Sequence, residues 1–359
     1  MPDKEIARFS VNYRQLLDQE GQLLGEIPAG LNPEQLKDFY RQMLLIRAVD
    51  RMAVNYQRQG RLGTYAPVEG QEACQVGSVP LLRDEDWVFP AFREQGVFLL
   101  RGIPLRCILL YFMGCEEANR VAAEQRTFPI SVPVASQLPL AVGCAMGLKL
   151  KKEEALAAVY FSDGATSEGD FSEALNFATV YQTPTVFFCQ NNQWAISVPR
   201  EKQTVAKTLA QKAIAYDMAT IQVDGNDVLA VYQTAKEAVE HVRQGKGPYF
   251  IEMVTYRRQM HTTADDPKKY MDPAKHEEWL KTDPIKRLEI YLKREGIVDD
   301  ALAATVAQEA ESLMKTEFEA ALGIVESQKP EEIFEYTYAL LPQNLREQQA
   351  DLMAFLKKS

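Results

Sequence analysis

An aspartate and an asparagine follow two neighbouring predicted strands, where their side-chain oxygens could bind a cation. Asp163 follows the apolar run 156–161, Asn192 follows the run 185–190, and the two residues lie 29 positions apart. A helix-like stretch at 171–181 separates the runs, which predicts a βαβ unit with both side chains at the carboxyl edge of a parallel sheet. Mg²⁺ prefers oxygen ligands and usually takes only one or two from side chains. The pair therefore predicts a Mg²⁺ site whose shell is completed by phosphate and water.

Backbone groups beside this pair could hold the phosphate. The carbonyl of Trp194 could supply a third oxygen, and Gly164 lets the backbone approach an anion closely because it has no side chain. The helix predicted to open near 166–169 offers free N–H groups and the positive end of its dipole. The Asp-Gly dipeptide or the Asn-Asn dipeptide taken alone is typical of a turn. At this spacing across a βαβ unit, however, the two together favour a diphosphate bridged by Mg²⁺.

The elements that must position these residues alternate between strand-like and helix-like stretches. Further strand candidates lie at 221–223 and 249–255, so the centre of the chain predicts βαβ units. Earlier in the chain, Asn32 and Pro33 provide the N-cap and first residue of a helix that ends near Gly60. The predicted fold class is α/β, with a central, mostly parallel sheet flanked by helices and with N- and C-terminal helical extensions.

An apolar stripe at helical spacing marks the C-terminal part of the chain. It could pack on a partner subunit or on this chain's own domain, and the sequence supports both interpretations equally. We place an N-terminal extension and helix at 1–60, the ligand-binding α/β domain at 61–290 and a C-terminal helical extension at 291–359. The stripe consists of Leu302, Val306, Ala310, Leu313, Ala320 and Ile324.

Composition excludes several classes of protein. The 359 residues carry a formal net charge of −10, which argues against a nucleic-acid surface because phosphate binding needs clustered lysine and arginine. No apolar run approaches the ~20 residues of a membrane span, and the first twenty residues lack the apolar core of a secretory signal. The five cysteines form no C-x-x-C pair. We expect a cytoplasmic protein that binds small molecules or protein partners.

The central stretch resembles a known motif. Ser162-Asp163-Gly164, followed by the asparagine pair that ends at Asn192, resembles the Gly-Asp-Gly and Asn-Asn motif of thiamine-diphosphate enzymes. The surrounding stretches 168–176 and 201–204 resemble specifically the α subunits of the E1 component of pyruvate dehydrogenase and its branched-chain relatives. The likeness runs from about residue 20 to the C-terminus. It implies a thiamine-diphosphate-binding fold, with the diphosphate side of the site in the 61–290 domain.

The resemblance also assigns roles outside the βαβ unit. Arg93 and Arg257 would meet the diphosphate, and the backbone of Val134 would touch the aminopyrimidine. Phe92 would lie near cofactor and substrate, and Tyr65 would belong to the substrate pocket. The implied set comprises His261 as the catalytic residue; Phe92, Arg93, Val134, Asp163, Gly164, Ala165, Asn192, Arg257 and His261 for the cofactor; Tyr65 and Phe92 for the substrate; and Asp163, Asn192 and Trp194 for Mg²⁺.

One of the three histidines stands apart in the sequence itself. His241 and His276 lie in charged, helix-like surroundings and are interpreted as solvated. His261 instead follows a predicted strand and begins a loop rich in threonine and aspartate, the kind of segment that often carries catalytic groups. A lone histidine is more often structural than catalytic. Together with the resemblance, its position predicts the active-site histidine.

Three departures from the family pattern bear on the substrate. Ser162 replaces the first glycine of the motif, and Phe92 replaces a tyrosine whose hydroxyl could bond substrate or phosphate. The segment 116–132, expected to pass over the cofactor, is poor in glycine. Thr262 and Thr263 occupy the loop that is phosphorylated in some relatives, and the sequence leaves open whether they are modified.

The resemblance implies oxidative decarboxylation of a 2-oxo acid, with pyruvate favoured and a branched-chain 2-oxo acid or acetoin as alternatives. The acyl group would pass to the lipoyl group of an E2 acyltransferase. This chain would act in an α₂β₂ heterotetramer, whose E1 β subunit supplies a glutamate that activates the cofactor. A non-catalytic assembly subunit is the alternative of another class. A Mg²⁺-nucleotide enzyme is disfavoured because no G-x-x-x-x-G-K-[ST] motif is present. A self-contained transketolase-like enzyme is disfavoured by the length.

Overall fold

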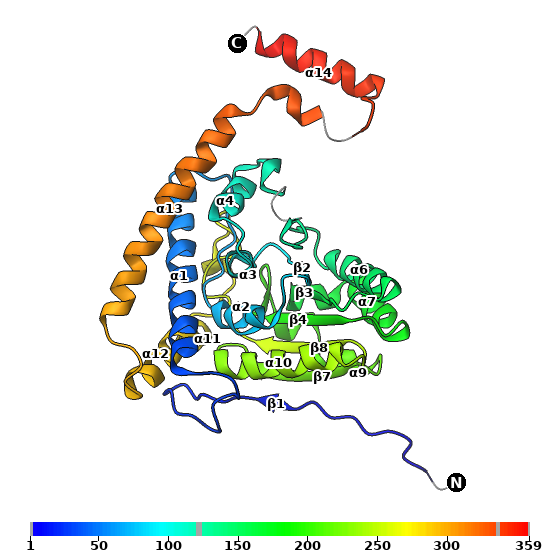
Figure 1. Cartoon of the computed structure of the whole chain (residues 1–359), viewed down its shortest axis with the longest axis vertical. Coiled ribbons are helices and arrows are strands. Elements are labelled where there is room, and N and C mark those ends of the chain that lie inside the picture. The colour runs from blue at the N-terminus through cyan, green and yellow to red at the C-terminus, as the bar shows by residue number, and fades with distance from the viewer. Residues whose placement is uncertain (1–2, 120–123, 335–337, 358–359) are drawn as a thin grey trace.

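A parallel sheet lies at the centre of the computed structural model, which describes residues 3–119, 124–334 and 338–357 (Figure 1). Its six strands follow the order β1-β7-β8-β4-β3-β2, and each neighbouring pair is parallel. The predicted parallel α/β fold is therefore confirmed. The strands are β1 Tyr13–Arg14, β2 Trp87–Phe89, β3 Ala157–Ser162, β4 Thr185–Asn191, β7 Ala219–Asp224 and β8 Tyr249–Val254, and a separate hairpin joins β5 Trp194–Ala195 to β6 Val198–Pro199.

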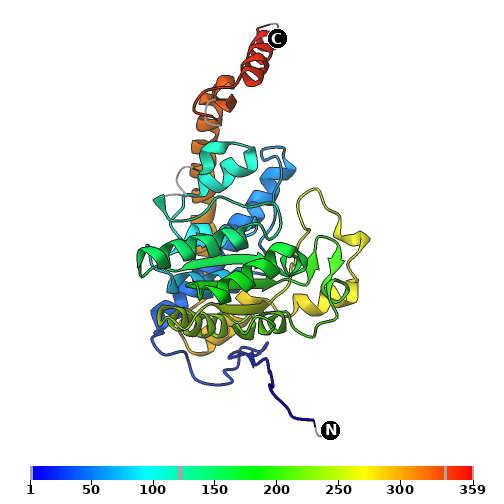
Figure 2. The same cartoon turned by 90° about the vertical axis from the view of Figure 1, so that its right-hand side faces the viewer.

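Helices cover both faces of this sheet, as Figure 2 shows. Alternate residues of β3 explain the two layers, because successive side chains of a strand point to opposite faces. Ala157, Val159 and Phe161 pack in the core beneath α6 (Gln137–Lys151) and α7 (Gly169–Val180). Ala158 and Tyr160 pack on the other face with α10. The remaining helices are α1 Pro33–Arg58, α2 Glu72–Ser78, α3 Gln95–Leu100, α4 Leu105–Met113, α8 Arg200–Gln203, α9 Ala210–Ile214, α10 Val228–Arg243, α11 Pro273–Leu280, α12 Pro284–Arg294, α13 Ala301–Ser327 and α14 Gln343–Leu356, with 3₁₀ turns η1 Val79–Leu81, η2 Glu116–Asn119, η3 Asp163–Ser167, η4 Pro267–Lys269 and η5 Pro330–Phe334.

Helix α1 begins as predicted, with a capping box. The Asn32 side chain accepts a hydrogen bond from the Gln35 backbone N–H, and the Gln35 side chain accepts one from the Asn32 N–H, each at 3.0 Å. The C-terminal stripe packs on this same chain, against α1 and α4. Its buried residues are Val306, Ala310, Met314, Phe318 and Ala321. Ala320, which was expected in the stripe, is exposed because Ala321 takes the inward position.

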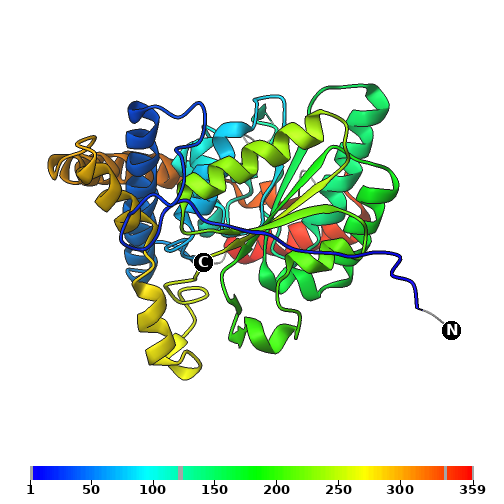
Figure 3. The same ribbon diagram turned by 90° about the horizontal axis from the view of Figure 1, so that it is seen from below.

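The described N-terminal segment and helix α14 lie far apart (Figure 1). The N-terminal segment runs past the sheet, where β1 pairs with β7 (Figure 3). At the other end, α13 leads away from the sheet, and α14 has no buried residue. Within the described ranges no helix is long and apolar enough to cross a membrane.

The glycine-poor segment 116–132 is described except for residues 120–123, which lie outside the described ranges. Its later part extends the sheet edge, because the Val88 N–H donates to the Arg126 carbonyl at 2.9 Å and the Phe128 N–H donates to the Val88 carbonyl at 2.7 Å. The segment then reaches Val132, which lines the cavity described below.

Candidate active site

Asp163 and Asn192 leave the sheet at the same edge. Strands β3 and β4 are parallel, with Ser162 opposite Gln190. Asp163 begins η3 directly after β3, and Asn192 follows β4 directly. The carboxyl ends of neighbouring parallel strands thus bring the two residues to the crevice where ligands of open α/β sheets bind.

A cavity of about 430 Å³ lies at this edge. Its apolar wall includes Ala66, Phe92, Phe112, Val134 and Ile196. A few polar groups converge on it from separate segments of the chain, as is usual for small-molecule sites. Those polar or charged residues are Thr64, Gln71, Arg93, Glu94, Ser162, Glu168, Gln190, Asn192, His261 and Thr262.

Asp163 is a fully buried carboxylate with one oxygen unsatisfied. Its Oδ2 accepts a hydrogen bond from Gln203 Nε2 at 2.6 Å, whereas Oδ1 has no hydrogen-bond partner among the described residues. Burial raises the pKa of this carboxyl above its usual value. A buried, incompletely paired carboxylate is costly unless a cation meets it. Its donor type suits a Mg²⁺ ion.

Asn192 is oriented by two hydrogen bonds. Its Nδ2 donates to Gln71 Oε1 at 2.6 Å, and its Oδ1 accepts from the Trp194 N–H at 3.2 Å. These bonds fix the orientation of the amide, with its oxygen toward the backbone of Trp194. Asn192 and Trp194 both line the cavity.

Arg257 is a buried guanidinium without an ion pair among the described residues. Its Nη2 donates to the Tyr270 hydroxyl at 2.6 Å, and that hydroxyl donates to Asp265 Oδ2. Its Nη1 lacks a partner within the described ranges, and burial lowers its pKa. The guanidinium carbon lies 5.9 Å from the centre of the Trp194 ring. An uncompensated, fork-shaped cation of this kind fits a phosphate.

His261 meets Arg93 at the wall of the cavity. Arg93 Nη2 lies 3.1 Å from His261 Nδ1 and donates to the His261 carbonyl at 2.9 Å. A guanidinium can only donate, so Nδ1 is an acceptor and the neutral ring carries its proton on Nε2. Burial, then the charges of Arg93 and Arg257, lowers the pKa of His261 to about 3. The ring is therefore neutral near pH 7.

Other predicted residues divide between the cavity and its surroundings. Phe92 and Val134 line the cavity, and the Phe92 ring meets the His261 ring edge-on with centroids 5.7 Å apart. Gly164 also lines it, and a Cβ on this residue would lie 3.0 Å from the Ala195 Cβ. This close contact is a steric reason for glycine at position 164, in addition to the approach of an anion to the backbone.

Four of the predicted residues are not in the cavity wall. Asp163 and Arg257 lie beside it, and Ala165 belongs to the buried core under α7. The Tyr65 side chain is 1% exposed, and its hydroxyl donates to Asp50 Oδ1 at 2.9 Å. Its ring packs on Phe112, which does line the cavity, with centroids 4.8 Å apart. Tyr65 thus adjoins the cavity through Phe112, and its backbone also binds the loop that carries His261, because the Tyr65 N–H donates to the Thr263 hydroxyl at 3.2 Å and the Thr263 N–H donates to the Tyr65 carbonyl at 2.9 Å.

Sequence reasoning did not single out three buried polar residues in the wall. Gln190 Nε2 donates to Glu94 Oε1 at 2.6 Å, and Gln71 orients Asn192. Burial raises the pKa of Glu94 to about 7. Gln190 could have been found from its sequence position, because a polar residue at the end of an otherwise apolar buried strand needs a partner.

Two smaller expectations can be compared with the structure. His241 and His276 are half-buried rather than solvated, since His241 Nε2 lies 3.1 Å from the Lys246 carbonyl and His276 Nδ1 lies 3.0 Å from the Tyr256 hydroxyl. Ser162 has φ −96° and ψ 174°, an extended conformation open to any residue. The turn before Asp163 therefore does not require glycine.

Comparisons with known proteins identify the family of this chain. The family model described as dehydrogenase E1 component matches residues 40–332. The 3-methyl-2-oxobutanoate dehydrogenase subunit alpha of Mycobacterium tuberculosis is 42% identical over 329 residues, which cover 92% of this chain and 89% of that relative. The pyruvate dehydrogenase E1 component subunit alpha of Staphylococcus epidermidis is 39% identical over 336 residues, which cover 93% of this chain and 90% of that relative. The names of these relatives specify two different 2-oxo acids.

Proposed function

The chain belongs to the dehydrogenase E1 component family, and from that premise we propose that it is the α subunit of a thiamine-diphosphate-dependent 2-oxo acid dehydrogenase. One observation carries the proposal. Asp163 Oδ1 and Arg257 Nη1 are buried, belong to groups of opposite charge and lack partners among the described residues. A Mg²⁺-diphosphate would satisfy both, because it offers a cation to the carboxylate and oxygens to the guanidinium.

The residues present fit this cofactor. Asp163, the Asn192 amide oxygen and the Trp194 carbonyl would hold Mg²⁺. Arg257 and Arg93 would neutralise the diphosphate, and η3 with Gly164 would bring backbone N–H groups near it. When bound, thiamine diphosphate supplies the electron sink that decarboxylation of a 2-oxo acid requires.

His261 would act as a neutral hydrogen-bond donor. Its Nδ1 is engaged by Arg93 at 3.1 Å, so the Nε2–H is the group left to bind an oxygen of the substrate or of the acyl group. A ring whose pKa lies at about 3 does not carry a positive charge near pH 7. Its role would be to orient an oxygen and stabilise negative charge that develops on it.

We propose pyruvate as the substrate, with a branched-chain 2-oxo acid as the alternative. Phe92 and Phe112 contribute bulky aromatic rings to the apolar wall, which supports a small acyl group. The alternative rests on the 42% identity to the mycobacterial branched-chain subunit against 39% to the staphylococcal pyruvate subunit. Initial rates of the reconstituted enzyme with pyruvate, 3-methyl-2-oxobutanoate and acetoin separate these substrates. A higher rate with 3-methyl-2-oxobutanoate would make the branched-chain 2-oxo acid the substrate in place of pyruvate.

The partners we propose are an E1 β subunit, in an α₂β₂ heterotetramer, and an E2 lipoyl acyltransferase that accepts the acyl group. Val134 and Ile196 support the first partner, because both line the cavity yet are 46% and 59% exposed. A β chain seated on this rim would cover them and contribute its glutamate.

The proposed function is tested by co-expressing the chain with an E1 β subunit from the same organism. Decarboxylation of a 2-oxo acid is then measured with and without thiamine diphosphate. Absence of cofactor-dependent turnover on every 2-oxo acid tried would contradict the proposal. Calorimetric titration with Mg²⁺-thiamine diphosphate separates this case from a non-catalytic assembly subunit, since binding that is lost in Asp163→Ala excludes a degenerate site.

A further inference from the structure

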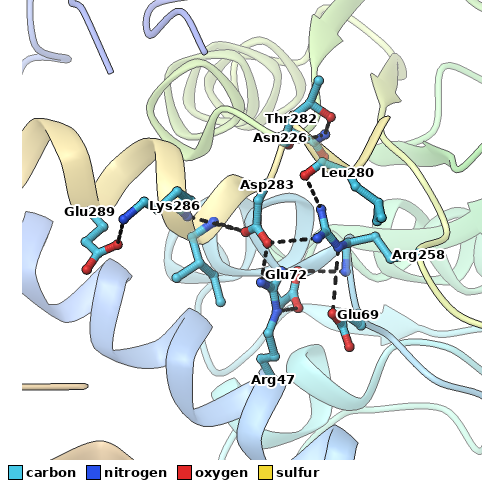
Figure 4. Close-up of polar contacts among 12 residues, drawn as sticks. Arg47, Glu69, Glu72, Asn226, Arg258, Leu280, Thr282, Asp283, Lys286 and Glu289 are labelled. Carbon is cyan, nitrogen blue, oxygen red and sulfur yellow. Dashed lines mark hydrogen bonds and ion pairs between the residues drawn. The ribbon is translucent and has the colours of Figure 1, made fainter. Parts of the chain in front are cut away.

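Three arginines and three carboxylates form a largely buried cluster next to the segments that line the cavity. We call it the arginine–carboxylate cluster, and its formal charges balance. Figure 4 shows how all its members except Arg51 meet from separate elements, with Arg47 on α1, Glu72 on α2 and Asp283 at the start of α12. The cluster comprises Arg47, Arg51, Glu69, Glu72, Arg258 and Asp283.

One half of this cluster ties α1 to α2 and α12. Arg47 donates to both carboxylate oxygens of Glu72, at 2.7 and 3.0 Å, and to Asp283 Oδ2 at 2.6 Å. Asp283 also caps α12, because its Oδ1 accepts from the Ile285 N–H at 2.9 Å. These contacts connect scaffold elements, and a structural role accounts for them.

The other half involves Arg258, which comes from the segment that carries His261. Its Nη2 lies 3.3 Å from Asp283 Oδ2, its Nε lies 3.7 Å from Glu69 Oε1, and its Nη1 donates to the Leu280 carbonyl at 3.1 Å. The guanidinium is thus held by one hydrogen bond, to Leu280, and by two ion pairs, of which the longer, to Glu69, leaves Nε without a hydrogen-bond partner among the described residues. Its side chain is only 13% exposed, so solvent screens these contacts weakly.

Arg257 and Arg258 are consecutive but contact different groups. The Arg257 side chain reaches the Tyr270 hydroxyl and the Trp194 ring, whereas Arg258 reaches the cluster. The backbone between them is fixed too, since the Arg257 N–H donates to the Asn192 carbonyl at 3.1 Å and the Arg258 N–H donates to the Glu69 carbonyl at 3.2 Å. Anchoring one side chain therefore sets the direction in which the other leaves the backbone.

Gly70 shows how closely the 256–258 segment packs against the backbone at Glu69 and Gly70. A Cβ on Gly70 would lie 2.1 Å from the Tyr256 carbonyl oxygen and 2.8 Å from the Arg258 Cγ. Beyond Arg258, Gln259 Nε2 donates to Glu69 Oε2 at 2.9 Å. The segment leading to His261 is thus packed directly against the Glu69–Gly70 backbone.

We propose that Arg258, anchored by Glu69 and Asp283, is a positioning residue that holds the Arg257 guanidinium and the His261 imidazole at the cavity. The roles given to Arg257 and His261 rest on the proposed function, but their placement does not. Loss of the Arg258 cation would leave the 257–261 segment held by its backbone hydrogen bonds and by Gln259, so that it can shift, while α1, α2 and α12 stay joined through Arg47. The consequence is a misplaced His261 in a folded protein.

Two substitutions and a matched control test this role. Arg258→Met keeps the long apolar stem and removes the charge, and Arg258→Lys returns a cation without the fork. Arg243→Met is the control, because Arg243 pairs with buried Asp86 and is 17% exposed. Asp86 immediately precedes β2, so that pair lies at the amino edge of the sheet, opposite the cavity.

The primary measurement is the titration of His261 in the full chain, by NMR of ¹³C-labelled histidine, with His261→Gln to assign the signal. Burial is the largest cause of the lowered pKa of His261, at about 3, and the nearby charges of Arg93 and Arg257 lower it further while Asp265 raises it. Displacement of the 257–261 segment would weaken both the burial and the contribution of Arg257. We expect Arg258→Met to raise this pKa by at least about one unit toward the unperturbed value of ~6.5. Arg258→Lys should restore it in part, and Arg243→Met should leave it unchanged at a comparable loss of thermal stability.

Steady-state kinetics of the complex with the β subunit form the second measurement. Arg258→Met should lower kcat by about tenfold or more and change KM for the 2-oxo acid by less than about threefold, because misplacement acts mainly on the transition state. If Arg258→Met does not fold, Glu69→Gln releases the same segment by removing one anchor and is measured in the same way. An unchanged His261 titration together with an unchanged kcat would overturn the proposal. A complex without turnover on any 2-oxo acid would refute the proposed function, while the His261 titration would still decide the role of Arg258.

Discussion

His261 Nδ1 and Arg93 Nη2 lie 3.1 Å apart, although their residues are separated by 168 positions in the chain. This contact sets the tautomer of the imidazole and, together with burial, keeps the ring uncharged near pH 7. It places a permanent cation beside a titratable ring that is already largely buried. The first prediction follows from that electrostatic relationship.

Acid should destabilise the protein through His261. Its pKa is about 3 in the folded chain, against ~6.5 when unfolded, so between these values the unfolded state binds a proton that the folded state does not. The contribution of this residue to the unfolding free energy therefore falls as the pH drops from about 6.5 toward 3. Urea unfolding of the wild-type chain and His261→Gln at pH 7.5 and 5.5 measures it. Equal pH dependence in the two proteins would contradict the prediction.

Asp163→Asn should stabilise the chain without cofactor and weaken cofactor binding. Burial raises the pKa of Asp163, and its Oδ1 has no partner among the described residues, so removing the charge should add about 1 kcal/mol to the unfolding free energy. Affinity for Mg²⁺-thiamine diphosphate should fall about a hundredfold or more, because a carboxylate ligand is lost. Thermal unfolding without cofactor and calorimetry with it give the two values. A stability loss combined with unchanged affinity would be the opposite result.

Glu94 should contribute an ionisation near neutral pH to the rate profile. Burial raises its pKa to about 7, and it lies in the cavity wall next to Arg93. Its folded pKa lies above the unfolded ~4.5, so its contribution to stability is complete below pH 4.5 and is lost as the pH rises through 7. We expect kcat/KM against pH to bend near 7 in the wild-type complex. In Glu94→Gln, which keeps the size of the side chain, the bend should be absent; its persistence would assign the ionisation to another group.

Gly70→Ala should cost far more stability than Gly245→Ala. Both glycines have positive φ, +105° and +72°, and an alanine at either position pays roughly 1–2 kcal/mol of backbone strain. At Gly245 the added Cβ would meet nothing within 4 Å, whereas at Gly70 it would lie 2.1 Å from a carbonyl oxygen. The loss at Gly70 should therefore exceed about 3 kcal/mol. Chemical denaturation of the two variants compares them directly, and similar losses would show that the 69–70 backbone can shift.

The sequence predicts local features of this protein better than distant ones. Every residue of β4, from Thr185 to Asn191, is buried, and such strands appear in the sequence as continuous apolar runs. The position of Asp163 and Asn192 can be predicted from the same pattern, because the two parallel strands of a βαβ unit both end at the carboxyl edge of the sheet. The short strand β1 is not visible in this way. Tyr13 pairs with Gln222, and Asp227 holds this segment by accepting the Leu16 and Leu17 N–H groups at 2.6 Å.

The same contrast between local and distant features applies to the candidate site. Arg93 meets His261, and Glu69 meets Arg258, although each pair is more than 160 residues apart in the sequence. Local periodicity does not predict contacts between residues so far apart. Tyr65 is a second example, since the sequence does not show that its hydroxyl binds Asp50 or that Phe112 lies between its ring and the cavity; its role toward a substrate stays a prediction. The domain boundaries near residues 60 and 290 stay predictions.

The strand order has a consequence for how this chain is made. Strand β8 is the last strand of the sheet in the sequence, yet it lies between β7 and β4 in the middle of the sheet. During synthesis, β4 and β7 therefore leave the ribosome well before the strand that joins them. Until Val254 has emerged, each presents an unpaired edge of the kind that associates with other chains. We expect a nascent chain halted before β8 to depend on chaperones, and one halted after it to need them much less.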